Sequence, residues 1–302
     1  MSKILLFDSS AFIYRAFYAI PASFSTKNGL QTNALYGFFL MVLTLLKTQT
    51  PDYAIFAFDA REKTFRHELF TEYKATRVKA PQSLYDQIPL IREGLEALQA
   101  TCVIAPGFEA DDILGAISSE HGGENLQIYI ATGDLDALQL VNNNVRVITP
   151  AKGIINLNIY DEQKVFDRFQ VSPKQIPDYK ALCGDKSDNI PGLMGIGPKQ
   201  ATKLLTEFKN IEGIYKNLDK LTAKIKNLFQ DNEKQVLLSK NLATIKTELN
   251  LKLEIENSAV DKFNTEALKT FFSKYECFNL IKKMDFLQKK TPVNETFQPS
   301  LF

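Results

Sequence analysis

The stretch Ile4-Leu5-Leu6-Phe7-Asp8 decides the fold, because an unbroken apolar run ends there in an acid. A continuous apolar run of this length predicts a strand that is buried on both faces, as parallel sheets require. Three further runs in the first half of the chain also lead to an acid: 54–58 before Asp59, 102–105 before Glu109, and 128–131 before Asp134.

Helical patterns separate these strands, over residues 34–48, 83–99 and 110–121. The alternation of strand and helix predicts an α/β fold, with a central, mainly parallel sheet that is flanked by helices. In open α/β sheets, ligands bind outside the carboxyl ends of the strands. We therefore expect the acids that follow the strands to converge on one edge of the sheet.

Carboxylates dominate the candidate site. They repel one another and raise one another's pKa unless a cation compensates. Hard divalent cations with oxygen ligands fit best, so we expect Mg²⁺, with Mn²⁺ able to substitute. Sites of this kind that hold two ions about 4 Å apart catalyse in-line displacement at phosphorus. The predicted metal ligands are nine acids: Asp8, Asp59, Glu109, Asp111, Asp112, Asp134, Asp136, Asp185 and Asp188.

Each acid taken alone also has a structural explanation. An Asp after a strand is a common turn residue, and acids in a first helical turn are favoured by the helix dipole. A helix start explains Glu109, Asp111 and Asp112 well. The occurrence of all four groups of acids at predicted strand ends favours the metal site.

The segment 61–80 interrupts the alternation of strand and helix, with six lysines and arginines against three glutamates. Its aromatic residues Phe65, Phe70 and Tyr73 are interleaved with the charges. Mixed charge is also typical of a solvated helix face. Beside an acidic metal site, however, aromatics and arginines favour binding of a single nucleic-acid strand, through stacking and phosphate pairing.

Residues 188–201 are rich in Gly and Pro and lead into a predicted helix. Glycines before a helix N-terminus expose backbone N–H groups to a phosphate, and Lys199 adds positive charge. The spacing of Gly195, Gly197, Lys199 and Ala201 is similar to that of a helix-hairpin-helix, which holds a DNA backbone without reading its sequence. An ordinary turn is the alternative, but the flanking acids and lysines favour DNA contact.

Composition narrows the remaining possibilities. The 302 residues carry 36 Lys plus Arg against 35 Asp plus Glu, so the net charge of +1 does not by itself indicate a nucleic-acid partner. Three distant cysteines and two histidines argue against a disulfide framework, a cysteine zinc site and a site of several imidazoles. The apolar runs are too short for a signal peptide or a membrane span, so we expect a cytoplasmic protein without a membrane partner.

Three regions are expected along the chain. Residues 1–175 form the α/β core, including the segment 61–80. Residues 176–288 form a helical, DNA-binding helix-hairpin-helix region. Residues 289–302 have no helical period and are expected to be a flexible tail.

The motifs also carry a resemblance to a known family. In order they are Phe7-Asp8-Ser-Ser with Tyr14-Arg15-Ala16, Phe58-Asp59 with Thr64-Phe65-Arg66, Tyr73-Lys74-Ala-Thr-Arg77, Glu109-Ala-Asp111-Asp112, Thr132-Gly133-Asp134-Leu-Asp136, and Gly184-Asp185-Lys-Ser-Asp188-Asn-Ile-Pro-Gly192. From about Lys3 to Phe278 the chain closely resembles the 5′-nuclease domain of bacterial DNA polymerase I, in the flap endonuclease family. The resemblance implies a PIN-like core with a helical arch at 61–80.

The resemblance also implies roles for individual residues. The nine acids match the metal-site acids of the family, and a K⁺ ion is implied at the hairpin, near Gly195 and Gly197. Lys74 and Arg77 are the implied catalytic cations, which neutralise charge on the phosphate. The implied DNA-binding residues are Arg15, Arg66, Tyr73, Lys74, Arg77, Gly192, Gly195, Gly197 and Lys199.

The implied function is that of a structure-specific 5′-nuclease, both 5′-3′ exonuclease and flap endonuclease. It would hydrolyse phosphodiester bonds of DNA 5′ ends, flaps and RNA primers, as a monomer in the bacterial cytoplasm and nucleoid. Branched or 5′-flapped DNA and RNA–DNA junctions are the expected partners. Metal ions would position and deprotonate the attacking water.

Two departures from the family concern the hairpin and the C-terminus. Gln200 stands where relatives often carry Thr, and the chain stops at residue 302, where a polymerase I would continue. We therefore expect a stand-alone nuclease, unless the chain is a fragment of a longer protein. The last five residues resemble a sliding-clamp-binding peptide, which predicts clamp contacts through Gln298, Leu301 and Phe302.

Two other classes of protein remain open. A phosphatase of the haloacid dehalogenase type also has an Asp after its first strand, but it needs a second acid two residues later, where this chain has Ser10. The other class is a non-catalytic DNA-junction-binding protein that keeps the nuclease fold. Binding alone would not need nine acids, which repel DNA when no metal is present.

Overall fold

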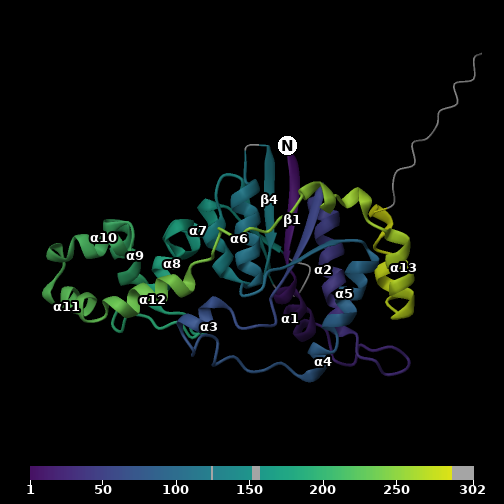
Figure 1. Cartoon of the computed structure of the whole chain (residues 1–302), viewed down its shortest axis with the longest axis horizontal. Helices are drawn as coiled ribbons and strands as arrows, with labels where there is room; N and C mark the ends of the chain where they lie inside the picture. The colour runs from purple at the N-terminus through teal and green to yellow at the C-terminus, as the bar shows by residue number, and fades with distance from the viewer. Residues whose placement is uncertain (124, 152–156, 288–302) are drawn as a thin grey trace, which may run out of the picture.

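A six-stranded sheet in the order β3-β2-β1-β4-β5-β6 forms the centre of the computed structural model, which describes residues 1–123, 125–151 and 157–287 (Figure 1). All neighbouring pairs from β3 to β5 are parallel, and β6 pairs with β5 in the antiparallel direction. The strands are β1 (Ser2–Asp8), β2 (Tyr53–Phe58), β3 (Thr101–Ile104), β4 (Leu126–Ala131), β5 (Val145–Pro150) and β6 (Leu157–Tyr160).

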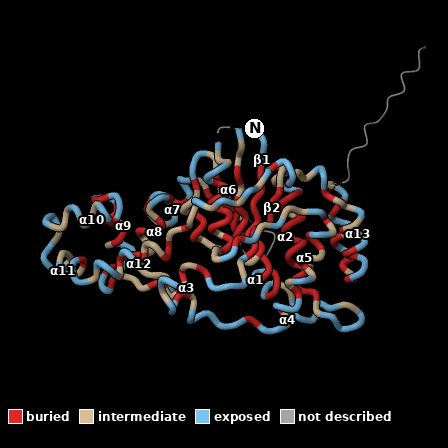
Figure 2. The backbone as a smooth tube through the Cα atoms, viewed as in Figure 1, coloured by how far each residue is buried: buried red, intermediate tan, exposed pale blue. Residues whose placement is uncertain are grey.

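Side chains of β1 alternate between two hydrophobic cores, because successive side chains in a strand point to opposite faces. Leu5 and Phe7 join the core that includes α1 (Ser9–Ala19), α2 (Asn33–Gln49) and α5 (Ile88–Ala97). Ile4 and Leu6 join the core that includes α6 (Ala110–His121). Buried backbone is concentrated at the sheet and these helices (Figure 2). The predicted mainly parallel α/β sheet, flanked by helices, is confirmed.

Two expectations about this core need correction. The strand β3 is not buried on both faces, since it lies at the edge of the sheet and Ile104 is 39% exposed. The helical pattern over 83–99 is divided into α4 (Gln82–Tyr85) and α5. The break occurs at Gln87, whose buried side chain accepts the N–H of Ala34 (2.8 Å) and so caps α2.

A helical arm extends from one side of the sheet (Figure 1). An ion pair joins two helices of this arm, since Lys240 Nζ lies 2.8 Å from the carboxylate of Asp178, which is buried. Asp178 also accepts the N–H of Ile211 (3.1 Å) at the start of α10. The helices that lead into and form this arm are α7 (Glu162–Phe169), α8 (Ile176–Cys183), α9 (Pro198–Phe208), α10 (Ile211–Lys216), α11 (Ala223–Asp231) and α12 (Glu233–Ala243).

The chain then returns to the far side of the sheet, where α13 (Thr265–Lys274) and α14 (Phe278–Ile281) pack beside α5 and α2. Phe272 of α13 contacts Phe39 of α2 with ring centroids 5.1 Å apart. The expectation that 176–288 forms one helical region therefore needs correction at its C-terminal end, because the apolar faces of α13 and α14 belong to the core of the α/β unit. None of the helices in the described residues is long and apolar enough to cross a membrane.

Phe56→Ala is expected to lower the free energy of unfolding by about 3–5 kcal/mol, since it leaves a cavity where the ring now stacks on Phe7 at 4.6 Å. Urea denaturation measures the loss. Val78→Ala is the control, because Val78 is 93% exposed and its loss should change stability by less than about 0.5 kcal/mol. Equal effects of the two variants would contradict this account of the core.

Candidate active site

The carboxyl ends of β1, β2 and β4 place three acids at one edge of the sheet. Asp8 ends β1 and caps α1 with its side chain. Asp59 follows β2 directly, and its Oδ1 accepts the N–H of Ala110 (2.8 Å) at the start of α6. Asp134 follows β4 through Thr132 and Gly133. Because β2, β1 and β4 are parallel neighbours, the three acids lie close together.

Negative charge at this edge is only partly neutralised by nearby cations. Burial, together with the neighbouring Asp59 and Asp134, raises the pKa of Asp8 to about 7. Burial also raises the pKa of Asp134, against the opposing effect of Lys180. For the same reason the pKa of Asp111 lies well above its ordinary value, although Arg66 opposes the shift.

Two other acids are paired with cations of the segment 61–80. Lys74 Nζ lies 2.8 Å from Glu109 Oε1, and Arg77 Nη2 lies 2.6 Å from Asp188 Oδ1. The Tyr73 hydroxyl lies between them and donates to either Glu109 (3.1 Å) or Asp188 (3.0 Å). Lys74 and Arg77 therefore already pair with charged oxygens at the acidic edge of the sheet.

Lys180 pairs with two further acids. Its Nζ, on the last turn of α8, contacts the carboxylates of both Asp136 and Asp185. The Asp185 carboxylate also accepts the N–H of Ser187 (2.7 Å). Burial raises the pKa of Asp185, but Lys180 and Ser187 outweigh it and lower the pKa to about 2.

Asp112 is held by Arg66 in a buried, two-pronged ion pair. Arg66 Nη1 and Nη2 lie 2.7 and 2.8 Å from the two Asp112 oxygens, and Arg66 is only 1% exposed. The remaining Arg66 donors reach Glu109 Oε2 (3.3 Å) and the backbone oxygens of Leu242 (3.0 Å) and Thr244 (3.1 Å). In this structure Arg66, predicted to bind DNA, instead ties the segment 61–80 to α6 and to the end of α12.

Contacts and electrostatic interactions link all nine predicted acids into one cluster, although several are engaged by lysine or arginine. Among the described residues, no three His, Cys, Asp or Glu side chains are arranged to hold a metal ion. The donor set is nevertheless all oxygen, which suits a hard divalent cation. Burial and nearby acids raise the pKa of Asp8, Asp111 and Asp134, and the positive charge of such a cation would stabilise their ionised forms. In the chemistry of their donors, though not in their present arrangement, the residues therefore fit a divalent metal.

The segment 61–80 is helical only over α3 (Phe65–Leu69), which corrects the expectation of a helical arch throughout. Beyond α3 the chain forms successive turns, such as the one closed by Arg77 N–H and the Lys74 carbonyl (3.0 Å), and it is also held to the loop 185–190. The N–H of Lys74 donates to the Asp188 carbonyl (2.9 Å), and the Asn189 side chain donates to the Glu72 carbonyl (2.8 Å). These bonds satisfy backbone groups that a helix would have used.

The predicted hairpin glycines have different structural roles. Gly192 is needed for packing, since a Cβ there would lie 2.5 Å from the backbone N of Gly184. Gly195 adopts the left-handed conformation (φ 95°) that favours glycine. Gly197 caps α9 and Lys199 lies exposed on its first turn, so both are open to a ligand.

Sequence reasoning missed two residues that position the acids. The Thr132 hydroxyl donates to Asp8 Oδ2 (2.7 Å) and accepts the N–H of Asp134 (3.0 Å), so it joins two strand ends. Lys180 precedes Asp185 by five residues, and only the turn after α8 brings the two together. Arg15, predicted to bind DNA, is exposed and donates to the carbonyl of Ala151 (2.8 Å). The predicted clamp residues Gln298, Leu301 and Phe302 lie outside the described residues.

Two family models together match residues 3–266. One is described as "5′-3′ exonuclease, N-terminal resolvase-like domain" and covers residues 3–170. The other is described as "5′-3′ exonuclease, C-terminal SAM fold" and covers residues 171–266.

Individual relatives agree with these matches. A 5′-3′ exonuclease of Aquifex aeolicus is 36% identical over 98% of this chain and 100% of its own length. DNA polymerase I of Caldicellulosiruptor bescii is 37% identical over 99% of this chain, and that of Bacillus caldotenax is 37% identical over 94%. The chain spans only 36% and 32% of those two polymerases.

Solved structures share the fold at lower identity. The T5 5′-exonuclease with bound zinc ions superposes with a TM-score of 0.64 at 19% identity, covering 90% of this chain and 97% of that one. The catalytic core of Rad2 in complex with a DNA substrate gives 0.60 at 16% identity, covering 95% and 92%. The likeness confirms the PIN-like nuclease fold.

Arg66→Ala is expected to destabilise the protein by about 3–5 kcal/mol, because it leaves the Asp112 carboxylate buried without its partner. Arg77→Ala is the control, since the Arg77 side chain is 49% exposed and its pair should contribute less than about 1 kcal/mol. Thermal unfolding of both variants compares the two costs. Similar losses would show that Arg66 is not the buried anchor described above.

Proposed function

This chain belongs to the 5′-3′ exonuclease family of metal-dependent nucleases, and we propose that it acts on 5′ ends, 5′ flaps and RNA primers at branched DNA. The carrying observation is that the acids after β1, β2 and β4 meet at the carboxyl edge of the sheet, with further acids beside them that pair with Lys74 and Arg77. Hydrolysis of a phosphodiester needs both kinds of group: carboxylates that can hold a metal ion, and cations that can pair with the phosphate.

Mg²⁺ is the proposed metal, with two or more ions and with Mn²⁺ able to replace it. When bound, such ions supply an activated water and stabilise the leaving 3′ oxygen, which gives 5′-phosphate and 3′-hydroxyl products. Asp112, Asp185 and Asp188 would act less directly, as second-site or water-mediated ligands, and Asp112 is already committed to Arg66. The nearest ligands would be Asp8, Asp59, Glu109, Asp111, Asp134 and Asp136.

The cations of the segment 61–80 would act on the scissile phosphate. Lys74 and Arg77 now pair with Glu109 and Asp188, so each side chain already reaches the acidic edge. When a phosphate is present, it offers the same charged oxygens as these carboxylates, and the two cations can pair with it. In that position they would neutralise the charge that develops during phosphoryl transfer.

Duplex DNA adjoining the cleavage site would lie along the hairpin of the helical arm. Gly195, Gly197 and Lys199 present backbone and positive charge at the start of α9. A K⁺ ion held by carbonyls near Gly195 and Gly197 would fit between hairpin and phosphate. Gly192 would contribute by letting the hairpin pack against Gly184.

The proposed setting is lagging-strand maturation and repair in a bacterial cytoplasm, close to the nucleoid. The protein would act as a monomer on RNA–DNA junctions and 5′-flapped DNA. Gln298, Leu301 and Phe302 would attach it to the sliding clamp.

Asp134→Ala is expected to lower cleavage of a 5′-labelled flap duplex in Mg²⁺ more than about 100-fold, since even outer-shell partners of a metal contribute 10–100-fold. EDTA should abolish cleavage by the wild-type protein, and a denaturing gel resolves the product. Tight binding without cleavage by the wild type would refute the nuclease and favour a non-catalytic junction-binding protein.

Lys199→Ala is expected to weaken binding to duplex DNA of any sequence and to reduce the salt dependence of log K by about one phosphate contact. Fluorescence anisotropy from 50 to 200 mM salt measures the slope. Lys262→Ala serves as the control, because Lys262 is exposed on the opposite part of the molecule, next to α13. An unchanged slope for Lys199→Ala would remove this contact from the proposal.

A further inference from the structure

One short stretch of chain carries two of the nine acids and also the hairpin that is proposed to hold duplex DNA. Asp185 and Asp188 lie in a closed loop, because Asp185 and Ile190 exchange two backbone hydrogen bonds (2.9 and 2.8 Å). The hairpin at Gly195 and Gly197 follows directly, and both glycines are exposed. Any displacement of this stretch therefore moves the bound duplex and two of the acids together.

The base of the hairpin is held by side chains of α12. Ser239, which is 0% exposed, donates its hydroxyl to the carbonyl of Pro191 (2.7 Å), and the half-buried side chain of Gln235 donates to the carbonyl of Gly192 (2.9 Å). In the part of the chain that the structure describes, no backbone N–H donates to either carbonyl. The two side chains of α12 therefore satisfy backbone groups that the hairpin itself leaves without a donor.

The far end of α12 is fixed to the α/β unit. The carbonyl of Leu242 accepts a hydrogen bond from Arg66 (3.0 Å), and Arg66 holds Asp112 of α6 in the buried ion pair described above. One helix thus joins the hairpin at its first half to the acidic edge of the sheet at its end. Its hydrogen bonds set how far the hairpin lies from the acids that follow the strands.

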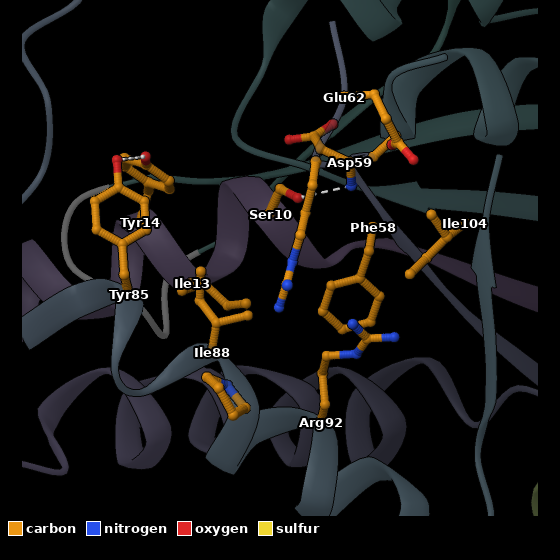
Figure 3. A pocket seen from close by; sticks show the side chains of 13 residues that line it. Ser10, Ile13, Tyr14, Phe58, Asp59, Glu62, Tyr85, Ile88, Arg92 and Ile104 are labelled. Atoms are coloured by element: carbon orange, nitrogen blue, oxygen red, sulfur yellow. Dashed lines mark hydrogen bonds between the residues drawn. The ribbon is translucent and has the colours of Figure 1, made fainter. Parts of the chain in front are cut away.

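The cavity of about 680 Å³ beside Asp59 does not fix the duplex in this way (Figure 3). Its lining residues, among those that the structure describes, all lie between positions 10 and 104, so they belong to the α/β unit and not to the arm. In Figure 1, α5 and α12 lie on opposite sides of β1. The position of a duplex on the hairpin therefore depends on the contacts of α12.

We infer that Ser239 and Gln235 are positioning residues that select which phosphodiester bond of the bound strand lies at the acidic edge. Successive nucleotides of one strand are about 3.4 Å apart along the duplex axis, so a hairpin displaced by that distance would present the neighbouring bond. A displacement of only about 1 Å would lower the rate instead, because such misplacement can cost about 100-fold. This inference rests on the proposed function and deepens it, since it assigns the choice of the cut to residues outside the acidic edge.

The double variant Ser239→Ala and Gln235→Met tests this role, because it removes both donors and keeps most of the side-chain volume. Gels at nucleotide resolution, with a 5′-labelled flap duplex in Mg²⁺, should show a share of cuts at neighbouring bonds about tenfold above that of the wild type. We expect kcat to fall about tenfold with KM little changed, since the exposed hairpin backbone that meets the duplex is intact. Ser273→Ala is the matched control, because its hydroxyl donates to the Lys269 carbonyl (2.9 Å) within α13.

The pattern of cuts separates positioning from a merely structural role. The gels are run well below the Tm of both proteins, which thermal unfolding gives. A lower rate at an unchanged cut site would overturn the inference, because loss of folded protein reduces all cuts in proportion. An unchanged rate and an unchanged pattern would overturn it as well.

A distance measurement gives a second test that does not depend on cleavage. Bioorthogonal spin labels at positions 194 and 120 report on the hairpin and on α6, since Met194 is 90% exposed and Glu120 is also exposed. Pulsed electron paramagnetic resonance should give a narrow distance distribution for the wild type and a broader or displaced one for the double variant. Equal distributions would overturn the inference. Failure of the wild type to cleave any flap would instead overturn the proposed function, while the distances would still decide whether α12 positions the hairpin.

Discussion

Repulsion among carboxylates at one edge of the sheet is the constraint on which the rest of the structure depends. Asp8 cannot leave this edge, because it ends β1 and caps α1 at the centre of the sheet. Its raised pKa shows the cost of holding several acids together in a buried place. The rest of the chain lowers this cost by bringing cations to the edge from three directions.

Those cations come from segments of very different rigidity. Arg66 is buried and fixed by backbone oxygens at the end of α12, so it makes a permanent connection between the arm and α6. Lys180 stands on the last turn of α8. Lys74 and Arg77 belong to a segment that is mostly turns and that is held by the acids themselves. The two cations that we propose to meet a phosphate are thus the ones whose release disturbs the core least.

The sequence predicts the strands and the edge on which the acids meet, since unbroken apolar runs such as 4–7 have few alternatives inside a protein. The sequence does not predict which charged side chains pair with one another in the fold. Arg66 and Arg77 have the same side chain in one basic segment, yet one is 1% exposed and the other has a side chain that is 49% exposed. That difference depends on α12, whose end reaches Arg66 from more than 170 positions away, and no local pattern records it.

Buried ion pairs and exposed cations serve different purposes in this molecule. Where a cation pairs with an acid inside the fold, as Arg66 pairs with Asp112, the ion pair is costly to break. Such a pair holds segments of the chain in position. Where cations stand exposed beside aromatic rings, as Arg92 stands beside Phe58, desolvating them has no internal compensation. An anion from outside supplies that compensation. Arginines such as Arg92, which make no ion pair within the described residues, are therefore a second indication of binding, beside the acids whose charge the chain compensates only in part.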